Sequence, residues 1–597
     1  MAIQTDQIKQ ITPDQIEQFK RLVILKREHQ AQLEQLLVSK LNRIYIEAMV
    51  HKEQIAQEWK SFTDFTRGAH WPTRRPKYKV SAVLNFIIEN IERKTALLTD
   101  AKPIPKVVPY RDQLQDTADI LNELIRLIFQ NSEFEQSKAD MLQNAQVFGS
   151  AFMGTVYDRS SKEIRVISYD PRAVYIDPLL LKSYLLAEAE FFILEDIWAI
   201  EKARDLFPKV ADRIRPDAML SVYQPYHQDP SLFRAMISNI FKQREDNMAK
   251  SEIPRVHVRE FWIKDRSREA NGKLRFTNAC RKIIQIGEVI ADDGSNPYTD
   301  GLFPSDMFTW HSDFHSCWGW GDVELLKNPQ ELQNKIVALV VENLMLSSNA
   351  IWIGDADALT KEDWIKLNNA PGSYVKKKPG RELRREPGLP FPEYVLKVMQ
   401  FLGAAKDEMT GMVDVMRGVR TGQVSSGVGI ESLQLMAQAL IRLRSRSVEA
   451  MDARIGRKLI SRIFQYYEPE KIVELLKLNR DSATIQAYSS ELLKPINQRN
   501  MQWTNDLMFR IEPGSSLGLA KTQRRIEAFK LHQAQAIDDE ALLNDLEYPN
   551  REKVLKRTEQ KRQDSENLEV AARTNPQAGG KTQRFPNQAG GSPKGRV

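Results

Sequence analysis

The sequence predicts an α+β protein that is predominantly helical, and three patterns lead to this class. Long stretches such as 323–349 and 392–418 place apolar residues three and four positions apart, which is typical of amphipathic helices. Two neighbouring stretches, 150–158 and 163–170, alternate polar and apolar residues around a short polar turn and predict a β-hairpin. The same two-residue period in 255–265 predicts a further strand.

The composition is that of a folded chain without a membrane span. Of the 597 residues, 42% are hydrophobic and 28% are charged, as in ordinary globular proteins. The net charge of +7 permits a polyanionic partner without requiring one, because acids and bases are interspersed. The longest apolar run, Ile336–Val341, is far shorter than the roughly 18–20 residues that cross a bilayer. The N-terminus also lacks a signal-peptide core, so we expect a soluble, unsecreted protein.

Cysteine usage points to a reducing compartment. Cys280 and Cys317 are the only cysteines in the sequence. Two cysteines in a chain of this length argue against a disulfide framework, although they leave room for a single bridge.

The first half of the chain is expected to carry a helical arm followed by a mixed α/β region. Thr12-Pro13-Asp14-Gln15 combines an N-cap, a proline at the first helical position and a capping-box glutamine. It therefore predicts the start of a helical arm that runs to about Phe65. Further expected elements are three helices within 80–150, separated by a turn at 101–110 and by Asn131-Ser132 and closed by Gly149, turns at Pro171 and Asp177-Pro178, and a helical segment at 195–250.

The second half alternates long helices with shorter mixed segments. An insert at 350–390 separates the helices 323–349 and 392–418, the first of which is entered near Asn328-Pro329. A loop rich in Gly, Ser and Val, 419–430, leads into a third long helix that ends near Tyr467. Expected after it are mixed structure over 471–515 with a strand within 504–516, charged helices over 521–563, and a disordered tail over 570–597 that is rich in Pro, Gly and Gln.

Neither glycine-rich stretch has the residues of a phosphate-binding P-loop. The loop 419–430 contains Gly427 and Gly429 but no lysine. The tail stretch 578–582, AGGKT, has Asn575 where the first glycine of the motif belongs. A nucleotide site is therefore not expected, and no sequence motif of a hydrolase, zinc protease or dinucleotide-binding fold occurs.

A metal site is not expected either. His311, His315 and Cys317 lie within seven residues, but the tryptophans around them and the lack of a second ligand pair favour a packed aromatic junction over zinc. Asp292-Asp293-Gly294 lacks the ligand alternation of a calcium loop and is interpreted as a turn. We therefore predict no catalytic residue, no metal and no cofactor.

Basic residues gather on the third long helix. Arg442 and Arg446 lie one turn apart and share a face. Two interpretations stay open: a solvated or intersubunit salt-bridging face, and a face that contacts nucleic-acid phosphates. Gly456 marks either a bend of this helix or a position of close packing. The other basic residues of the helix are Arg444, Arg454, Arg457, Lys458 and Arg462.

The order of these segments resembles that of the portal proteins of tailed bacteriophages, over roughly 80–560. Stretches that match in kind are 81–109, 145–178, 255–265, 425–449 and 509–529. The resemblance implies a portal fold with the following parts: an N-terminal helical arm (1–66), an α/β wing (67–320), a first stem helix (321–349), an α/β clip (350–390), a second stem helix (391–418), a tunnel loop (419–430), a long kinked helix (431–468), a return to the wing (469–520), crown helices (521–563) and a disordered basic tail (564–597).

The resemblance also implies a structural, non-enzymatic function. The chain would form a homo-oligomeric ring, usually dodecameric, at one capsid vertex of the virion, after assembly in the host cytoplasm. Its channel would pass double-stranded DNA during packaging and ejection. Implied partners are DNA, the large terminase subunit, the major capsid protein, the scaffolding protein and a head–tail adaptor protein, with no membrane.

Candidate site residues follow from carrying this scheme onto the chain. A tunnel loop with one cation and small or polar residues touches DNA without clamping it, since each neutralised phosphate adds salt-dependent affinity. The candidate channel residues are Arg420, Gln423, Ser425 and Ser426 with Arg442 and Arg446 of the adjoining helix. In the clip, a basic cluster with two tryptophan anchors is predicted to dock a partner, with a solvated turn as the alternative. These clip residues are Trp352, Trp364, Lys376, Lys377, Lys378, Arg381, Arg384 and Arg385.

Two other classes of protein remain as alternatives. A nucleic-acid-processing enzyme with an unrecognised active site would show a usable nucleotide or metal site. A monomeric helical scaffold protein would form no closed ring.

Overall fold

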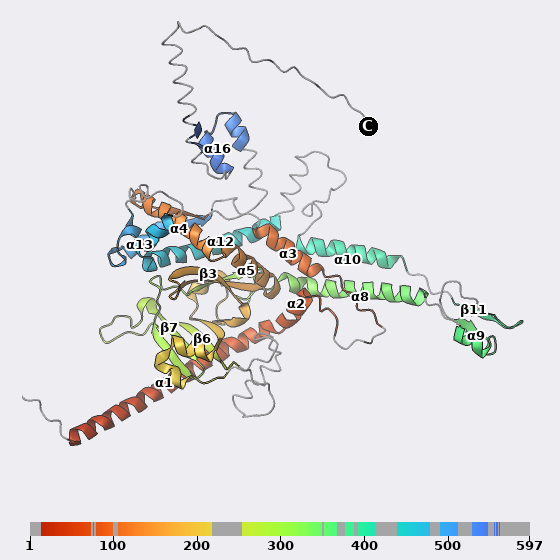
Figure 1. The fold of residues 1–597 in the computed structure, drawn as a ribbon, viewed down its shortest axis with the longest axis horizontal. Coiled ribbons are helices and arrows are strands. Elements are labelled where there is room, and N and C mark those ends of the chain that lie inside the picture. Colours follow the sequence, from red (N-terminus) through yellow and green to blue (C-terminus); the bar gives the residue numbers. More distant parts are fainter. Residues whose placement is uncertain are drawn as a thin grey trace, which may run out of the picture. The chain divides into compact units, whose positions relative to one another are not determined.

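The computed structural model describes most of the chain and divides into two compact units (Figure 1). The first unit is Met1–Leu517 and the second is Gly518–Val597. Among the described helices, none joins the length to the apolar composition that crossing a bilayer requires. The described residues are 13–72, 76, 79–99, 105–217, 253–348, 352–366, 376–386, 392–411, 439–477, 490–511, 528–546, 554–555, 557–558 and 560.

A five-stranded antiparallel sheet supports the N-terminal helix α1 (Pro13–Ala56) in the first unit. Leu41, Tyr45 and Met49, four residues apart on one face of α1, are buried against Ile193 and Phe261 of the sheet. The predicted strand at 255–265 is confirmed as β6, the central strand. The sheet consists, in spatial order, of β4 (Val174–Ile176), β5 (Phe191–Ala199), β6 (Arg255–Lys264), β7 (Cys280–Ile286) and β8 (Val289–Ser295).

Two predictions in this region are wrong. Within the segment 195–250, predicted helical, residues 195–199 belong to β5, and helix α6 (Ile200–Leu206) starts only after it. Phe191–Ala199, which is apolar or aromatic at every position except Glu195 and Asp196, pairs with β6 along its length, so tertiary pairing determines the strand. Asp292-Asp293-Gly294 lies inside β8 and not in a turn, because Asp293 pairs across the sheet with Arg281 at 2.7 Å.

The predicted hairpin is confirmed and forms part of a three-stranded antiparallel sheet of order β3-β2-β9. Gly149 ends the preceding helix α5 (Phe134–Phe148) with φ +81°, as expected for its C-cap. A Cβ at this glycine would lie 2.1 Å from the carbonyl oxygen of Gly319, so only glycine fits. The strands are β2 (Ser150–Asp158), β3 (Glu163–Tyr169) and β9 (Ser305–Thr309).

Helix α12 (Ala439–Tyr466) lies in the largest hydrophobic core, together with the helices of residues 115–148. Gly456 of α12 faces the ring of Phe509, which a Cβ would meet at 2.1 Å, so the structure supports close packing as the reason for this glycine. The predicted turn at 101–110 is wrong over its second half. Residues Pro105–Pro109 form β1, which pairs with β12 (Leu507–Ile511) about 400 residues later and confirms the strand expected within 504–516.

The two long helices around the insert lie side by side (Figure 1). They are α8 (Asp322–Ser348) and α10 (Tyr394–Thr410). Pro329 lies inside α8 rather than at its start, because the helix begins at the buried Asp322. The insert between them contains β10 (Trp352–Gly354), α9 (Lys361–Lys366) and β11 (Leu383–Arg385), and β10 and β11 form an antiparallel pair.

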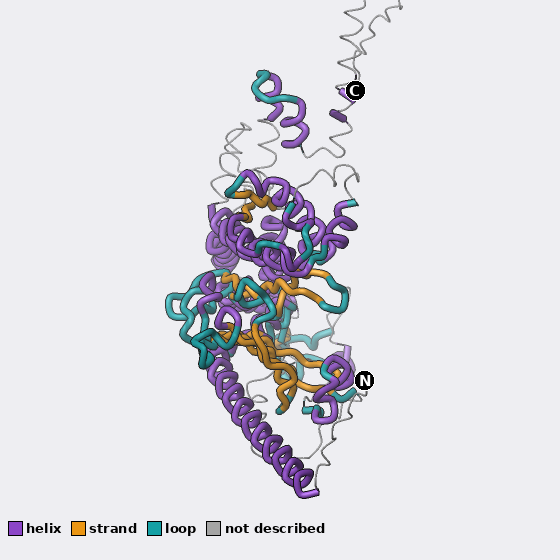
Figure 2. The backbone as a smooth tube through the Cα atoms, turned by 90° about the vertical axis from the view of Figure 1, so that its left-hand side faces the viewer, coloured by secondary structure: helices purple, strands orange, loops and turns teal. Residues whose placement is uncertain are grey.

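The remaining helices cover the sheets. In Figure 1 the strands labelled β3, β6 and β7 lie between α1 on one side and helices α4, α12 and α13 on the other, and Figure 2 shows these layers turned by 90°. In the second unit the structure describes α16 (Asp539–Asp545). Further helices of the first unit are α2 (Trp59–Thr66), α3 (Phe86–Thr99), α4 (Gln115–Asn131) and α13 (Pro469–Leu476), with short 3-10 helices at Asp112–Leu114, Pro171–Ala173, Ser183–Glu188, Pro208–Arg213, Thr277–Ala279, Glu491–Leu493, Ile496–Gln498 and Met501–Asp506.

Candidate DNA-channel and partner-docking surfaces

In the second half of α12, Lys458 and Arg462 are buried inside the chain and Arg454 is half-buried, whereas Arg457 is exposed. Arg462 is 0% exposed and donates to Asp300 at 2.9 Å. Lys458 forms an ion pair with Asp306 at 2.8 Å, and Arg454 donates to the carbonyl of Met307 at 3.1 Å. Burial lowers the pKa of Lys458, and the carboxylate of Asp306 acts in the opposite direction. Arg454, Lys458 and Arg462 therefore attach α12 to β9 and to the segment before it. They form neither a solvated or intersubunit face nor a face that contacts nucleic-acid phosphates.

The first half of α12 presents its cations differently. Arg444 is half-buried and donates to Nδ1 of His311 at 2.5 Å. Arg442 is half-buried and Arg446 is exposed, one turn apart as predicted. The four tunnel-loop candidates, Arg420, Gln423, Ser425 and Ser426, lie outside the described residues. Arg442 and Arg446 are thus the candidate channel residues whose positions the structure gives.

The HSDFHSC stretch forms a packed junction at the start of α8. The side chain of His311 stacks on Trp320 with ring centroids 3.9 Å apart and hydrogen-bonds the buried carboxylate of Asp322 at 3.2 Å. His315 is exposed, whereas Cys317 is buried in a hydrophobic cluster, where burial raises the pKa of its thiol to about 12. In the described part of the chain, no three His, Cys, Asp or Glu side chains are arranged to hold a metal ion.

Asp322 is the charged centre of this junction. Its carboxylate accepts from the ammonium of Lys94 at 2.7 Å and from the indole of Trp310 at 2.9 Å, in addition to His311. Burial alone would raise the pKa of Asp322, but the hydrogen bond from His311 and the charge of Lys94 lower it to about 2. Asp322 therefore stays negatively charged at the start of α8. Its carboxylate binds both Lys94 of helix α3 and the residues Trp310 and His311 that follow β9.

Helices α8 and α10 expose apolar stripes on the faces that point away from the rest of the chain. Leu332, Leu339 and Leu346 recur every seven residues on α8 and are 47%, 61% and 72% exposed. On α10 the corresponding stripe contains Tyr394 and Phe401, which are 66% and 70% exposed. Monomeric proteins rarely leave contiguous apolar surface of this kind uncovered.

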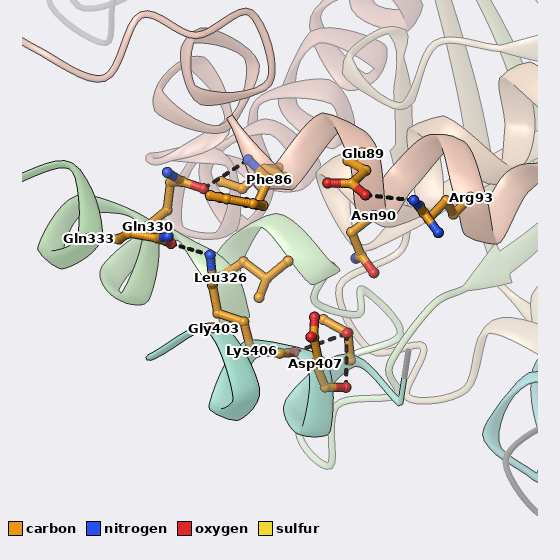
Figure 3. Close-up of a pocket in the computed structure, with 12 residues that line it drawn as sticks. Phe86, Glu89, Asn90, Arg93, Leu326, Gln330, Gln333, Gly403, Lys406 and Asp407 are labelled. Carbon is orange, nitrogen blue, oxygen red and sulfur yellow. Dashed lines mark hydrogen bonds and ion pairs between the residues drawn. The ribbon is translucent and has the colours of Figure 1, made fainter. Parts of the chain in front are cut away.

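A cavity of about 310 Å³ lies between α3, α8 and α10 (Figure 3). Lys406 of α10 crosses it, donates to the amide oxygen of Gln333 and lies 3.6 Å from the centre of the Phe86 ring. Gly403 also lines the cavity, and a Cβ there would meet no atom within 4 Å. The charged residues of its lining are Glu89, Arg93, Lys406 and Asp407. Its residues are Phe86, Ile87, Glu89, Asn90, Arg93, Leu326, Gln330, Gln333, Gly403, Lys406, Asp407 and Thr410.

The clip candidates lie on and around the β10–β11 pair. Trp352 is half-buried opposite Arg385, whereas Trp364 lies in α9 and its side chain is outside the described part. Arg381 pairs with Asp357 at 2.7 Å and Arg384 with Glu386 at 3.4 Å, so acids of the same insert offset part of the basic charge. All of the remaining basic candidates, Lys376, Lys377, Lys378 and Arg385, have exposed side chains.

Sequence reasoning missed a buried polar cluster beneath α1. The carboxylate of Glu195 accepts from the hydroxyls of Tyr45 and Tyr175, each at 3.0 Å, and from Arg259 at 3.0 Å. Next to it, Lys52 donates to two backbone carbonyls, and burial lowers the pKa of its ammonium to about 7. A usable indication was present, because strand β6 places Arg259 among apolar residues and such a buried charge requires a partner.

Comparison with known proteins identifies the family. A family model described as the phage P22-like portal protein matches residues 42–307 and 315–590, which is nearly the whole chain. No curated protein matches the sequence. The match begins within α1 and covers α8, the insert, α10 and α12. The chain therefore belongs to the P22-like portal protein family.

Proposed function

We propose that this chain closes into a ring whose channel passes double-stranded DNA and whose outer parts dock the packaging and tail proteins. Membership of the family gives it a phage portal role at the capsid vertex, within an oligomeric ring and with structural rather than enzymatic character. The single observation that carries the proposal is the pair of exposed apolar stripes on α8 and α10.

The stripes fit a head-to-tail contact between copies. Leu339 lies on α8 and Phe401 on α10, on faces that do not meet within one chain. Two different surfaces of one subunit that are complementary to each other form a heterologous interface, which closes into a ring when the rotation between copies permits it. Burying one such side chain stabilises the assembly by roughly 1.5–3 kcal/mol, and every subunit contributes the same amount. In this proposal α8 and α10 are the stem helices.

The other parts follow the portal scheme. Residues 67–320 and 469–520 form the wing, 350–390 the clip, 419–430 the tunnel loop and 521–563 the crown. Arg442 and Arg446, with the tunnel loop, contact DNA phosphates weakly enough for the duplex to slide, because a dense row of ion pairs would hold it in a strongly salt-dependent grip.

The clip docks acidic surfaces of the packaging motor and then of the tail adaptor. Lys376, Lys377 and Lys378 are consecutive and exposed, so they form a compact positive patch. Trp352 and Trp364 supply the aromatic anchors that protein interfaces favour. Complementary charge at such a patch mainly accelerates and orients the encounter with each partner.

The experiment is native mass spectrometry of the purified chain, combined with negative-stain class averages. We expect a closed ring with an open centre for the wild type. Phe401→Glu and Leu339→Glu each place a charge in the proposed interface and are expected to yield monomers with unchanged helix content. Gln400→Glu adds the same charge to an exposed neighbouring position of α10 and is expected to leave the ring intact. A wild type that stays monomeric, or stripe variants that still close, would refute the proposed interface.

A further inference from the structure

Two histidines are among the side chains that attach helix α8 to the rest of the first unit, beside contacts such as those of Gln330 and Lys327. His311 links Asp322, the first residue of α8, to Arg444 of α12. His70 follows α2 and binds Asn334, close to the middle of α8. Both rings use both of their nitrogens and are stacked on an aromatic neighbour, Trp320 and Phe65 respectively. The proton on each ring is therefore determined by its partners.

His311 must be neutral to make its two bonds. Arg444 has only N–H donors, so Nδ1 of His311, 2.5 Å from its guanidinium, has to accept. The ring proton then lies on Nε2 and is donated to the carboxylate of Asp322 at 3.2 Å. A second proton would lie on Nδ1 and point at the guanidinium, which places two donors and two positive charges against each other.

His70 is constrained in the same way. The backbone N–H of Leu84 donates to Oδ1 of Asn334 at 3.2 Å, which fixes the orientation of that amide. Its Nδ2 group therefore faces His70 and donates to Nδ1 at 2.6 Å. Nε2 of His70 carries the proton and donates to the carbonyl of Phe65 at 2.7 Å. A proton on Nδ1 would replace the bond to Asn334 with a contact between two donors.

We propose that α8 is held by an acid-sensitive attachment, in which protonation of His311 and His70 releases α8 from α12 and from the segment after α2. Histidine is the side chain that ordinarily changes charge between about pH 5 and 8, which sets the pH range over which this attachment is to be tested. The inference goes beyond ring formation and DNA passage, because it concerns bonds within one chain and can be measured on a monomer.

The charged groups around His311 do not remove the repulsion between a proton on its Nδ1 and the guanidinium of Arg444. Asp322 of α8 and Lys94 of α3 lie on the Nε2 side of His311, and Arg444 of α12 lies on the Nδ1 side. Asp322 attracts protons to the ring, but its side already holds one, so an added proton can bind only where it faces Arg444. The hydrogen bonds given for His70 join it to neutral groups of α2 and α8 alone. Both attachments thus weaken in the same direction, as the pH falls.

The test is amide hydrogen exchange of the full chain in the Phe401→Glu background, read by mass spectrometry on peptides covering Asp322–Ser348. Rates are corrected for the chemical dependence of exchange on pH. Between about pH 8 and pH 5, we expect exchange in the first half of α8 to accelerate roughly tenfold or more. His311→Asn and His70→Asn each keep an acceptor near the Nδ1 position and cannot take up a proton, so the double variant is expected to lose the acceleration.

A matched control separates this effect from general acid destabilisation. His532 pairs with Asp539 in the second unit at 2.7 Å, and His532→Asn is expected to leave the pH dependence of α8 unchanged. Corrected exchange of α8 that does not change with pH in the wild type would overturn the proposal. So would an equal acceleration in the double asparagine variant. Neither outcome depends on whether the chain closes into a ring, because the bonds of His311 and His70 lie within one chain.

Discussion

Helices α12 and α10 differ in which side chains they bury: α12 buries charged residues, whereas α10 exposes apolar ones. In α12, Lys458 and Arg462 are buried and paired with acids of the same chain. In α10, Tyr394 and Phe401 are exposed although they are apolar. A buried charge is tolerated only where its partner is already in place, whereas an exposed apolar stripe gains free energy when something covers it. The difference teaches that the charges in the second half of α12 are satisfied within a single chain, and it supports the proposal that another copy covers α10.

The largest expected effect comes from removing a carboxylate beside α12. Asp306→Ala leaves the buried ammonium of Lys458 and the half-buried Arg454 without their shared acid. The free energy of unfolding is expected to fall by about 3–5 kcal/mol, because an uncompensated charge remains buried. The measurement is equilibrium urea denaturation in the Phe401→Glu background, so that assembly does not contribute to stability.

An exposed ion pair provides the comparison for that value. Asp357→Ala removes the partner of Arg381 in the insert, where both side chains are about half exposed. Such a pair contributes about 0–1 kcal/mol. If the two variants lost the same stability, α12 would not be held by its buried charges.

The next effect concerns the tight contact between α12 and β12. Gly456→Ala places a Cβ 2.1 Å from the ring of Phe509, so we expect a loss of about 1–3 kcal/mol. An alanine in a helix interior would otherwise gain stability over glycine. Urea denaturation of the single variants and of the double variant with Phe509→Leu measures the coupling. Additive losses, with no recovery in the double variant, would show that the ring is not what excludes the side chain.

Features determined by residues close together in the sequence could be predicted, whereas features determined by residues far apart in the sequence could not. The hairpin at 150–170 and the cap at Gly149 are local, since turn residues and periodicity within a few positions determine them. The pairing of β1 with β12 is not local: Val107 meets Phe509 only after the chain has folded, so a turn was predicted in place of the strand.

The candidate sites show the same limit. Arg454, Lys458 and Arg462 lie four residues apart and occupy one face, which the sequence reveals. Their partners, Asp300 and Asp306, lie about 150 residues earlier, and nothing local assigns them. Without those partners, a buried row of cations and a solvated basic face have the same pattern. The docking role of Lys376, Lys377 and Lys378 and the channel role of Arg442 stay predictions.

The smallest expected effect has the opposite sign to that of Gly456. Gly403→Ala in α10 adds a Cβ that meets no atom within 4 Å, beside the cavity between α3, α8 and α10. We expect the monomeric background to gain about 0.5–1 kcal/mol in unfolding free energy, because alanine loses less backbone entropy in a helix. The same substitution in the otherwise wild-type chain, measured by native mass spectrometry, tests whether a neighbouring copy reaches this cavity. If the substitution stabilises the monomer and the ring still forms, the contact between copies is confined to the exposed stripe of α10. If it stabilises the monomer but weakens the ring, that contact extends to Gly403. A monomer that loses stability would contradict the open space and, with it, the contrast between the two helices.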